Sequence, residues 1–315
     1  MTSSVDAGRS APGEGPQRAA GNRRKWTGEH TLAWAFLAPS VLVFAVFLIY
    51  PLLYTVYLSM HGNDIVGNPS TFVGLDQFAE MMTPEFAKIF ANTLLFTVGT
   101  VAPGVAGALL IVLLLEARIR GRRVFRTGFA LPFAFSVASA SVVFSVFYNP
   151  ASGVLNGILY RFDLPPVEWL TSQDLAMWSI ILTTVWMNLG YGVLVLSAGL
   201  GAIQPDIIEA ARIDGATGHR LSWHILVPLL GPQLFFLIVL STINALQGFG
   251  QIHILTKGGP ADETTTLVYS IYQEAFATGS ANFGGASAQA LVLFLIVLVC
   301  TAVQFGVIER KVHYS

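Results

Sequence analysis

Charged side chains are scarce in this sequence. Only 11% of its 315 residues are Asp, Glu, Lys or Arg, whereas 54% are hydrophobic, and the mean hydropathy is +0.63. Soluble domains carry about 25% charged residues, so this chain has too few polar groups to cover a globular surface. The composition excludes an ordinary soluble protein and predicts one that membrane lipid solvates.

Cysteine, net charge and catalytic motifs are also nearly absent. Cys300 is the single cysteine, so no disulfide framework can form within the chain. The formal net charge of −1 gives no overall basic field, so we expect no nucleic-acid partner. The sequence contains no Gly-x-x-x-x-Gly-Lys-Ser/Thr phosphate loop, no Gly-x-Ser-x-Gly elbow and no His-Glu-x-x-His zinc pair. We therefore expect no catalytic residue, no metal and no cofactor.

Long apolar segments take the place of these features. A membrane-spanning helix needs about 20 mostly apolar residues. Six segments meet this requirement, at residues 32–58, 89–115, 124–147, 175–202, 225–247 and 288–307. We predict an all-α integral membrane domain with six transmembrane helices over residues 29–315. A polar tail over residues 1–28 precedes it and is predicted to be disordered.

The positive charges lie unevenly along the chain. Fourteen of the 17 Lys and Arg residues fall in the tail, in the second connection or the helix end beside it, in the fourth connection, or at the C-terminus. Lys88, Arg161 and Lys257 are the other three. Because cytoplasmic loops retain positive charge, we predict a multi-pass plasma-membrane protein with both termini cytoplasmic. The external connections are then residues 62–88, 149–174 and 248–287.

The connection at residues 204–228 carries a distinct local pattern. Pro205 suits the first turn of a helix, Asp206 suits the positive end of the helix dipole, and Gly215 suits the left-handed position that ends a helix. An apolar side is formed by Ile207, Ile208, Ala211 and Ile213. The pattern predicts an amphipathic helix-turn-helix on the cytoplasmic face, with a helix lying on the lipid surface as the alternative.

The spacing within this loop is also informative. Glu209-Ala210-Ala211 is followed by Gly215, Ile225 and Pro228. This resembles the cytoplasmic loop of binding-protein-dependent ABC import permeases, whose pattern is Glu-Ala-Ala, three residues, Gly, nine residues, Ile, one residue, Leu-Pro. Val227 stands where the family has Leu. The resemblance implies a type I ABC importer permease fold with a coupling helix between the fourth and fifth transmembrane helices.

The resemblance also implies partners. The residues that would contact the ATPase are Glu209, Ala210, Ala211, Asp214 and Gly215. The partners would be an ABC ATPase dimer, on which ATP hydrolysis resides, a second homologous permease subunit, and an extracytoplasmic substrate-binding protein. The chain itself would be a non-catalytic subunit that forms half of the translocation path.

Further segments resemble the carbohydrate-uptake, maltose-type branch of these permeases. They are Leu37-Ala-Pro39, Tyr50-Pro51, Leu131-Pro132, Asn149-Pro150-Ala-Ser-Gly153 and Leu255-Thr-Lys-Gly-Gly-Pro260. Within this branch, residues 258–276 and 303–314 resemble the first permease subunit of sn-glycerol-3-phosphate importers. That implies sn-glycerol-3-phosphate or a glycerophosphodiester as the solute. A neutral sugar such as a disaccharide is the alternative, because disaccharide permeases share much of both segments. The candidate contacts with the binding protein are Lys257, Gly258, Gly259 and Pro260.

Uncharged polar residues interrupt two of the apolar segments. Asn244, Gln247 and Gln251 are spaced i, i+3 and i+7, which predicts one helical face near the outer end of the fifth segment. Asn188 and Tyr191 interrupt the fourth. These residues are candidates for the translocation path, and hydrogen bonding between helices is the alternative. No Lys or Arg lies deep in any segment, so an anionic solute would meet uncharged donors, helix ends or a partner.

Two other classes of membrane protein are the rival hypotheses. A secondary transporter would need carboxylates or histidines within its spans for the coupling ion, and no Asp or Glu is centred in a segment. An intramembrane hydrolase would need the catalytic motifs that are missing. Copurification with a second permease and an ATPase pair would distinguish an importer subunit from both.

Overall fold

The computed structural model describes residues 26–64, 67–116, 122–277 and 281–307. These residues belong to two units, Met1–Leu53 and Tyr54–Ser315. Most of the predicted tail, residues 1–25, lies outside the described residues. So do several cations used to predict the orientation, namely Arg118, Arg120, Arg310 and Lys311.

The first unit consists of a long apolar helical segment. It is formed by α1 (Trp26–Phe44), the π-helix η1 (Ala45–Ile49) and the start of α2 (Tyr50–Ser59). Residues 26–28, which we assigned to the tail, belong to α1. The stretch Ala33–Ser59 is 27 residues long and apolar enough to cross a membrane, in agreement with the predicted span at residues 32–58.

The second unit is almost entirely helical in its described residues. Its further elements are β1 (His61–Asn63), β2 (Pro69–Phe72), α3 (Asp76–Glu80), α4 (Pro84–Glu116), α5 (Arg122–Ala130), the 3-10 helix η2 (Leu131–Ala134), α6 (Val137–Phe147), α7 (Val154–Arg161), α8 (Ala176–Ala202), α9 (Pro205–Ile213), α10 (Gly218–Leu221), the π-helix η3 (Ser222–Leu226), α11 (Val227–Leu229), α12 (Gly231–Leu246), α13 (Gly250–Leu255), α14 (Leu267–Tyr272), the π-helix η4 (Gln273–Ala277) and α15 (Phe283–Val307).

Three of the predicted spans in this unit are single helices and two are bent. The helices α4, α8 and α15 are each long and apolar enough to cross a membrane. The third span bends by 99° between Val124–Ala134 and Val137–Phe147, and the fifth by 68° between Gly218–Leu229 and Gly231–Leu246. With each bent pair counted as one span, the total is six, as predicted. We predicted each of these two spans as one transmembrane helix. Proline removes a backbone donor and clashes with the preceding turn, and Pro132 and Pro232 lie close to the two breaks, in η2 and at the start of α12.

A buried core joins the central helices to the 204–228 loop. The helix α4 packs against α8 and α12. We call the cluster formed by the following residues the loop-side core: Ala108, Val112, Leu113, Val193, Leu196, Leu200, Ala211, Ala216, Leu221, Leu226, Leu230 and Leu237. A glycine allows this close packing, because a Cβ at Gly192 would lie 2.7 Å from the Cβ of Ala108. Small residues at such contacts are typical of membrane helices.

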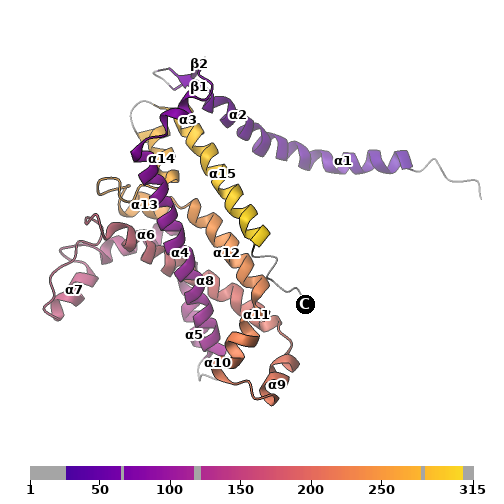
Figure 1. Ribbon diagram of the computed structural model, residues 1–315, viewed down its shortest axis with the longest axis vertical. Helices are drawn as coiled ribbons and strands as arrows, with labels where there is room; N and C mark the ends of the chain where they lie inside the picture. The colour runs from indigo at the N-terminus through magenta and orange to yellow at the C-terminus, as the bar shows by residue number, and fades with distance from the viewer. Residues whose placement is uncertain (1–25, 65–66, 117–121, 278–280, 308–315) are drawn as a thin grey trace, which may run out of the picture. The chain divides into compact units, whose positions relative to one another are not determined.

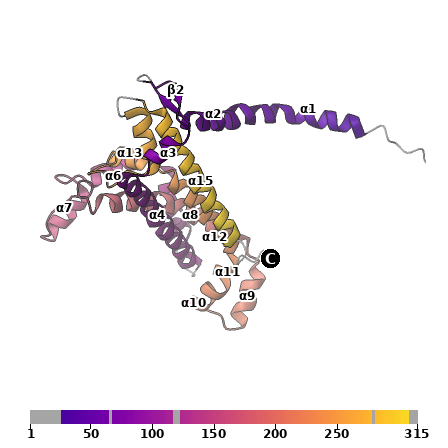
Figure 2. The ribbon, with the colours of Figure 1, turned by 45° about the horizontal axis from the view of Figure 1, so that its top comes forward.

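The two ends of the second unit carry different elements. Figures 1 and 2 both show α9 and α10 at one end and the β1–β2 hairpin with α3 at the opposite end. The hairpin is antiparallel and pairs His61 with Phe72 and Asn63 with Pro69. We did not predict it from the sequence. Isolated hairpins are marginally stable. This one is tied to the last helix region by a hydrogen bond from Asn63 Nδ2 to the Ala281 carbonyl (3.3 Å).

Candidate functional site

The helix α9 ends in a defined hydrogen-bonded cap. The amide of Ala216 donates to the Ala211 carbonyl (2.9 Å) and the amide of Gly215 donates to the Arg212 carbonyl (3.1 Å). Gly215 has φ +82°. This is the Schellman motif. A residue in the left-handed conformation, here Gly215, follows the helix, and the amide of the next residue donates to a carbonyl in the last turn of the helix. The predicted helix, its stop at Gly215 and the second short helix that begins after Thr217 are confirmed.

The cap also explains the spacing between Ala211 and Gly215. Ala211 accepts the outer hydrogen bond of the cap and Ala216 donates it, and both side chains are buried in the loop-side core. Ile208 also packs against that core. Two residues of the predicted apolar side, Ile208 and Ala211, therefore pack against the protein, whereas Ile207 and Ile213 are exposed.

The other side of α9 is exposed. Glu209, Ala210 and Asp214 are exposed and lie on or beside the last turns of the helix. Ile213 is 81% exposed, although a large aliphatic side chain is usually buried. The exposed surface of α9 thus combines a carboxylate with an isoleucine that contacts little of its own subunit.

Two cavities lie beside α9. One, of about 700 Å³, is lined by Glu116, Ile203, Pro205, Ile208, Glu209, Arg212 and Ile213. The second, of about 430 Å³, lies beside α10 and is lined by Leu113, Glu116, Arg212, Thr217, Gly218, Leu221, Ser222 and Leu226. Glu116, at the end of α4, and Arg212 line both cavities. Of the coupling residues predicted from the sequence, Glu209 lines the first of these cavities.

Asn188 and Tyr191 lie on α8 but have different surroundings. Asn188 lines a cavity of about 20 Å³ together with Thr100 and Ser241, between α4, α8 and α12. That volume is enough for one water molecule, and Thr100 Oγ1 is buried without a hydrogen-bond partner. The ring of Tyr191 lies 5.4 Å from that of Phe133. This position of Asn188 is consistent with both predictions, a hydrogen bond between helices and a residue of the translocation path.

The three polar residues of the fifth span do not share one helix. The helix α12 ends at Leu246 with Gln247 as its C-cap, and Gln251 belongs to the separate helix α13. The prediction of a single helical face is wrong, because the chain breaks at Gly248, where a Cβ would lie 2.6 Å from the ring of Phe96. Asn244 and Gln247 are exposed. Gln251 is only 9% exposed.

A group of aromatic side chains near the bend in the third span was not identified from the sequence. The ring of Trp186 on α8 lies 6.0 Å from that of Phe135 and 5.2 Å from that of Phe144. Phe135 lies within the break between η2 and α6. Single aromatics in apolar segments resemble lipid-facing residues, so only the fold shows that they gather. The Leu131-Pro132 pair was the available signal for the break.

The loop that follows α13 has an unusual backbone. Lys257, Gly258, Ala261 and Asp262 have positive φ angles, and the bond between Gly259 and Pro260 is cis. Gly258 is buried, and a Cβ there would lie 2.5 Å from Thr265 Oγ1. Of the four predicted contact residues, Lys257 is exposed, Gly259 and Pro260 are partly exposed, and Gly258 serves the turn itself.

The helix α4 holds this loop in place. Lys88 Nζ pairs with Glu263 (2.8 Å) and donates to the Ala261 carbonyl (2.9 Å). Asn92 Nδ2 donates to the Asp262 carbonyl (3.0 Å), and Thr93 Oγ1 accepts from the amide of Leu267 (2.9 Å). The loop is therefore a rigid surface feature.

A cleft joins this loop to the 149–153 segment. It has a volume of about 420 Å³ and is lined by Ser145, Tyr148, Asn149, Pro150, Leu170, Thr171, Leu255, Thr256, Gly259 and Pro260. The Tyr148 hydroxyl donates to the Ser179 carbonyl (2.9 Å). Burial raises the pKa of the Tyr148 phenol above its usual value, while its hydrogen bond to Thr183 acts in the opposite direction. Two segments that were singled out separately in the sequence thus form one surface.

Comparison with known families gives one match over most of the second unit. Residues 116–314 match the family described as binding-protein-dependent transport system inner membrane component.

Curated relatives extend the match to most of the chain. The sn-glycerol-3-phosphate transport system permease proteins of Agrobacterium fabrum and Brucella abortus biovar 1 are 36% and 37% identical to it over 90% of this chain and 97% of their own. The corresponding protein of Escherichia coli is 34% identical over 93% of this chain and 97% of its own.

Solved structures show the same fold. A bacterial ABC transporter involved in the import of the acidic polysaccharide alginate matches with a TM-score of 0.78 and 24% identity, over 91% of this chain and 99% of that chain. The bacterial alginate ABC transporter in complex with a periplasmic protein bound to alginate pentasaccharide matches with a TM-score of 0.80 and 22% identity, over 93% and 100%. The type I importer permease fold follows from these likenesses.

Proposed function

This chain belongs to the binding-protein-dependent transport system inner membrane components, and from that premise we propose how it works within an importer. It is a multi-pass membrane permease subunit. We infer that α9 is its coupling helix and that Glu209, Ala210 and Asp214 contact an ABC ATPase. A second permease subunit would complete the translocation path, and an external binding protein would deliver the solute.

The packing of α9 is the observation that carries this proposal. Ala211 and Ala216 anchor the helix in the loop-side core, together with residues of α4 and α8. The exposed Glu209 and Ile213 face away from that core. A push on this surface would move α4 and α8 with α9, because close-packed interiors transmit displacement. That is the mechanical property a subunit needs if its energy comes from ATP hydrolysis on a separate chain.

We infer that the solute is sn-glycerol-3-phosphate or a glycerophosphodiester. The support is the name shared by relatives that are 34% to 37% identical over nearly the whole chain. The candidate path residues Asn188, Asn244 and Gln247 are exposed amides, which is costly against lipid unless they are paired or solvated. Amides can donate to phosphate and to hydroxyl oxygens.

A neutral sugar is the second candidate. The aromatic group of Phe135, Phe144 and Trp186 favours it, because ring faces pack well against the C–H surface of a sugar ring. The path residues of this chain include no cation, so they do not discriminate between the two solutes.

Reconstitution tests the proposal. The chain would be coexpressed with its neighbouring permease and ATPase subunits, purified as a complex and placed in vesicles with the binding protein. Uptake of sn-glycerol-3-phosphate, glycerophosphodiesters and disaccharides would then be measured with and without ATP. We expect ATP-dependent uptake of the phosphate compounds. Uptake driven by an ion gradient without any ATPase would instead indicate a secondary transporter.

A further inference from the structure

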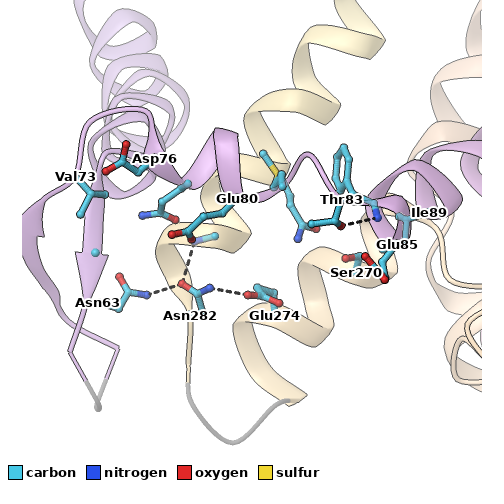
Figure 3. A pocket seen from close by; sticks show the side chains of 16 residues that line it. Asn63, Val73, Asp76, Glu80, Thr83, Glu85, Ile89, Ser270, Glu274 and Asn282 are labelled. Atoms are coloured by element: carbon cyan, nitrogen blue, oxygen red, sulfur yellow. Dashed lines mark hydrogen bonds between the residues drawn. The ribbon is translucent and has the colours of Figure 1, made fainter.

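A cavity of about 560 Å³ lies between the first and last of the connections predicted to be external. Figure 3 shows Glu80 and Glu85 on the α3 and α4 side and, facing them, Glu274 and Asn282 on the side of α14 and α15. Pockets of this size can enclose a small molecule or a long side chain. None of its lining residues belongs to the 204–228 loop or to the candidate path.

The cavity is strongly acidic. Its lining includes four carboxylates, Asp76, Glu80, Glu85 and Glu274, and no Lys, Arg or His. We call it the acidic pocket. Lys88 is close in sequence, but its amine is engaged by Glu263 and the Ala261 carbonyl. Within the described part of the chain, no cation pairs with any of the four carboxylates, and the undescribed residues 65–66 and 278–280 contain no charge.

Two amide oxygens in the pocket wall lack a hydrogen-bond donor, whereas the Glu274 carboxylate accepts a hydrogen bond from Asn282 Nδ2 (2.6 Å). Gln289 is 8% exposed and lines the pocket, and its Oε1 is buried without a hydrogen-bond partner. Asn63 Oδ1 is in the same condition. A buried acceptor without a donor costs about 1–3 kcal/mol. These acceptors and the carboxylates therefore call for a ligand that supplies several N–H donors and positive charge.

The arrangement does not suit a metal ion. In the described residues, no three His, Cys, Asp or Glu side chains are placed to hold one metal. Carboxylates that surround a cavity without converging fit an ammonium or guanidinium group, which offers donors in several directions. The same charges repel an anionic solute, so the pocket is not a binding site for the phosphate compounds.

We propose that the acidic pocket receives a lysine or arginine side chain of the extracytoplasmic substrate-binding protein. This inference rests on the proposed function, which supplies that partner. The pocket lies at the end of the second unit opposite to α9 (Figure 2), where an external protein would dock. It would hold that protein at a second point besides the 256–260 loop.

Charge-neutral variants test the proposal in the assembled transporter. The double variant Glu80→Gln and Glu85→Gln removes two charges with little change in volume. Affinity for the purified binding protein would be measured in nanodiscs at low and at physiological salt. We expect at least a tenfold loss of affinity and a weaker salt dependence, because charges at an interface act through salt-screened attraction. The matched control is Asp163→Asn with Asp174→Asn, two exposed external carboxylates outside the pocket, and should bind like the parent.

A covalent test identifies the partner group. A carbodiimide activates a carboxylate, and an amine in contact with it then forms an amide with loss of the activated leaving group. If the inserted group is a lysine, mass spectrometry should find Glu80, Glu85 or Glu274 joined to a lysine of the binding protein. If it is an arginine, no crosslink forms, and the loss of affinity in the double variant tests the proposal. Equal affinity of the pocket and control variants would overturn the proposal, as would crosslinks only to lipid amines. If the parent complex transports solute normally in that case, only the pocket assignment fails.

Discussion

Gly215 has a backbone role and no packing role. Its φ is +82°, and no atom lies within 4 Å of the position that a Cβ would occupy. An alanine here would therefore be disfavoured by the backbone conformation alone, by about 1–2 kcal/mol. This free-energy cost would destabilise the turn at the end of α9, next to Glu209 and Asp214.

We expect Gly215→Ala to loosen the end of α9 and to reduce the amount of solute transported per ATP hydrolysed by about fivefold, the factor that about 1 kcal/mol represents. The measurement is uptake and ATP hydrolysis in the same vesicles. Gly201→Ala is the matched control, since Gly201 also has open space around it but lies within α8 without a positive φ. Equal coupling in the two variants would contradict the role of the turn.

Asn244 and Gln247 differ from Gln251 in a way that permits a second prediction. Asn244 on α12 and Gln247 at its C-cap are exposed, whereas Gln251 is buried. We expect Asn244→Ala and Gln247→Ala each to lower uptake efficiency about five- to tenfold, because one lost hydrogen bond to the solute costs about 1 kcal/mol. Thermal unfolding should change little for exposed positions. Unaltered uptake kinetics would remove both residues from the path.

At the scale of elements, Asn156 organises the 149–170 connection. Its side-chain amide donates to the carbonyls of Pro150 and Val167 (both 3.0 Å). Its oxygen accepts from the Val167 amide (3.1 Å) and from Trp169 Nε1 (2.9 Å). Every donor and acceptor of this buried side chain is thus used to hold α7 and the following turn together.

We expect Asn156→Ala to destabilise the connection by about 2–3 kcal/mol, because several buried polar groups would lose their partner together. Hydrogen exchange across residues 149–170 should increase by tens of fold, while exchange in α4 and α8 stays low. Gln173→Ala, at an exposed position of the same connection, is the control. Unchanged protection in the Asn156 variant would show that other contacts hold the loop.

The positions of the membrane-spanning helices could be predicted well, because a single physical requirement determines them. Crossing a membrane demands a long apolar helix, so α4, α8 and α15 were located from hydropathy to within about five residues. The bends near Pro132 and Pro232 could not be predicted, because membrane helices often tolerate proline when neighbouring groups satisfy the backbone. Gln251 was misplaced for a different reason, because the break at Gly248 lies against the ring of Phe96, a contact that only the fold shows.

The structure of the 204–228 loop was predictable because its determinants are local. A helix start at Pro205, a buried Ala211 and a left-handed Gly215 lie within eleven residues. The acidic pocket was not predictable, because Glu80 and Glu274 are separated by most of the chain and only the packing of the helices brings them together. The same applies to the aromatic group around Trp186.

At the scale of the whole molecule, the orientation of the chain is open to direct test. We expect a cysteine at position 163 to react with a membrane-impermeant maleimide on intact cells, and a cysteine at position 217 to react only after the membrane is opened. Both Asp163 and Thr217 are exposed, and Cys300 would be replaced by Ser in the background. The reverse labelling pattern would place α9 outside and end its assignment to an ATPase.

The length of α4 has a consequence for how the two faces communicate. This helix has 33 residues, about 50 Å at 1.5 Å per residue, against a hydrocarbon thickness of about 30 Å. Near one end of α4, Lys88 forms an ion pair with Glu263 of the 256–266 loop. Near the other end, Val112 and Leu113 belong to the loop-side core, which also contains Ala211 of α9. Under the proposed function, docking of the binding protein near one end and ATP hydrolysis on the partner near the other would both act on this one helix, which would connect the two faces directly.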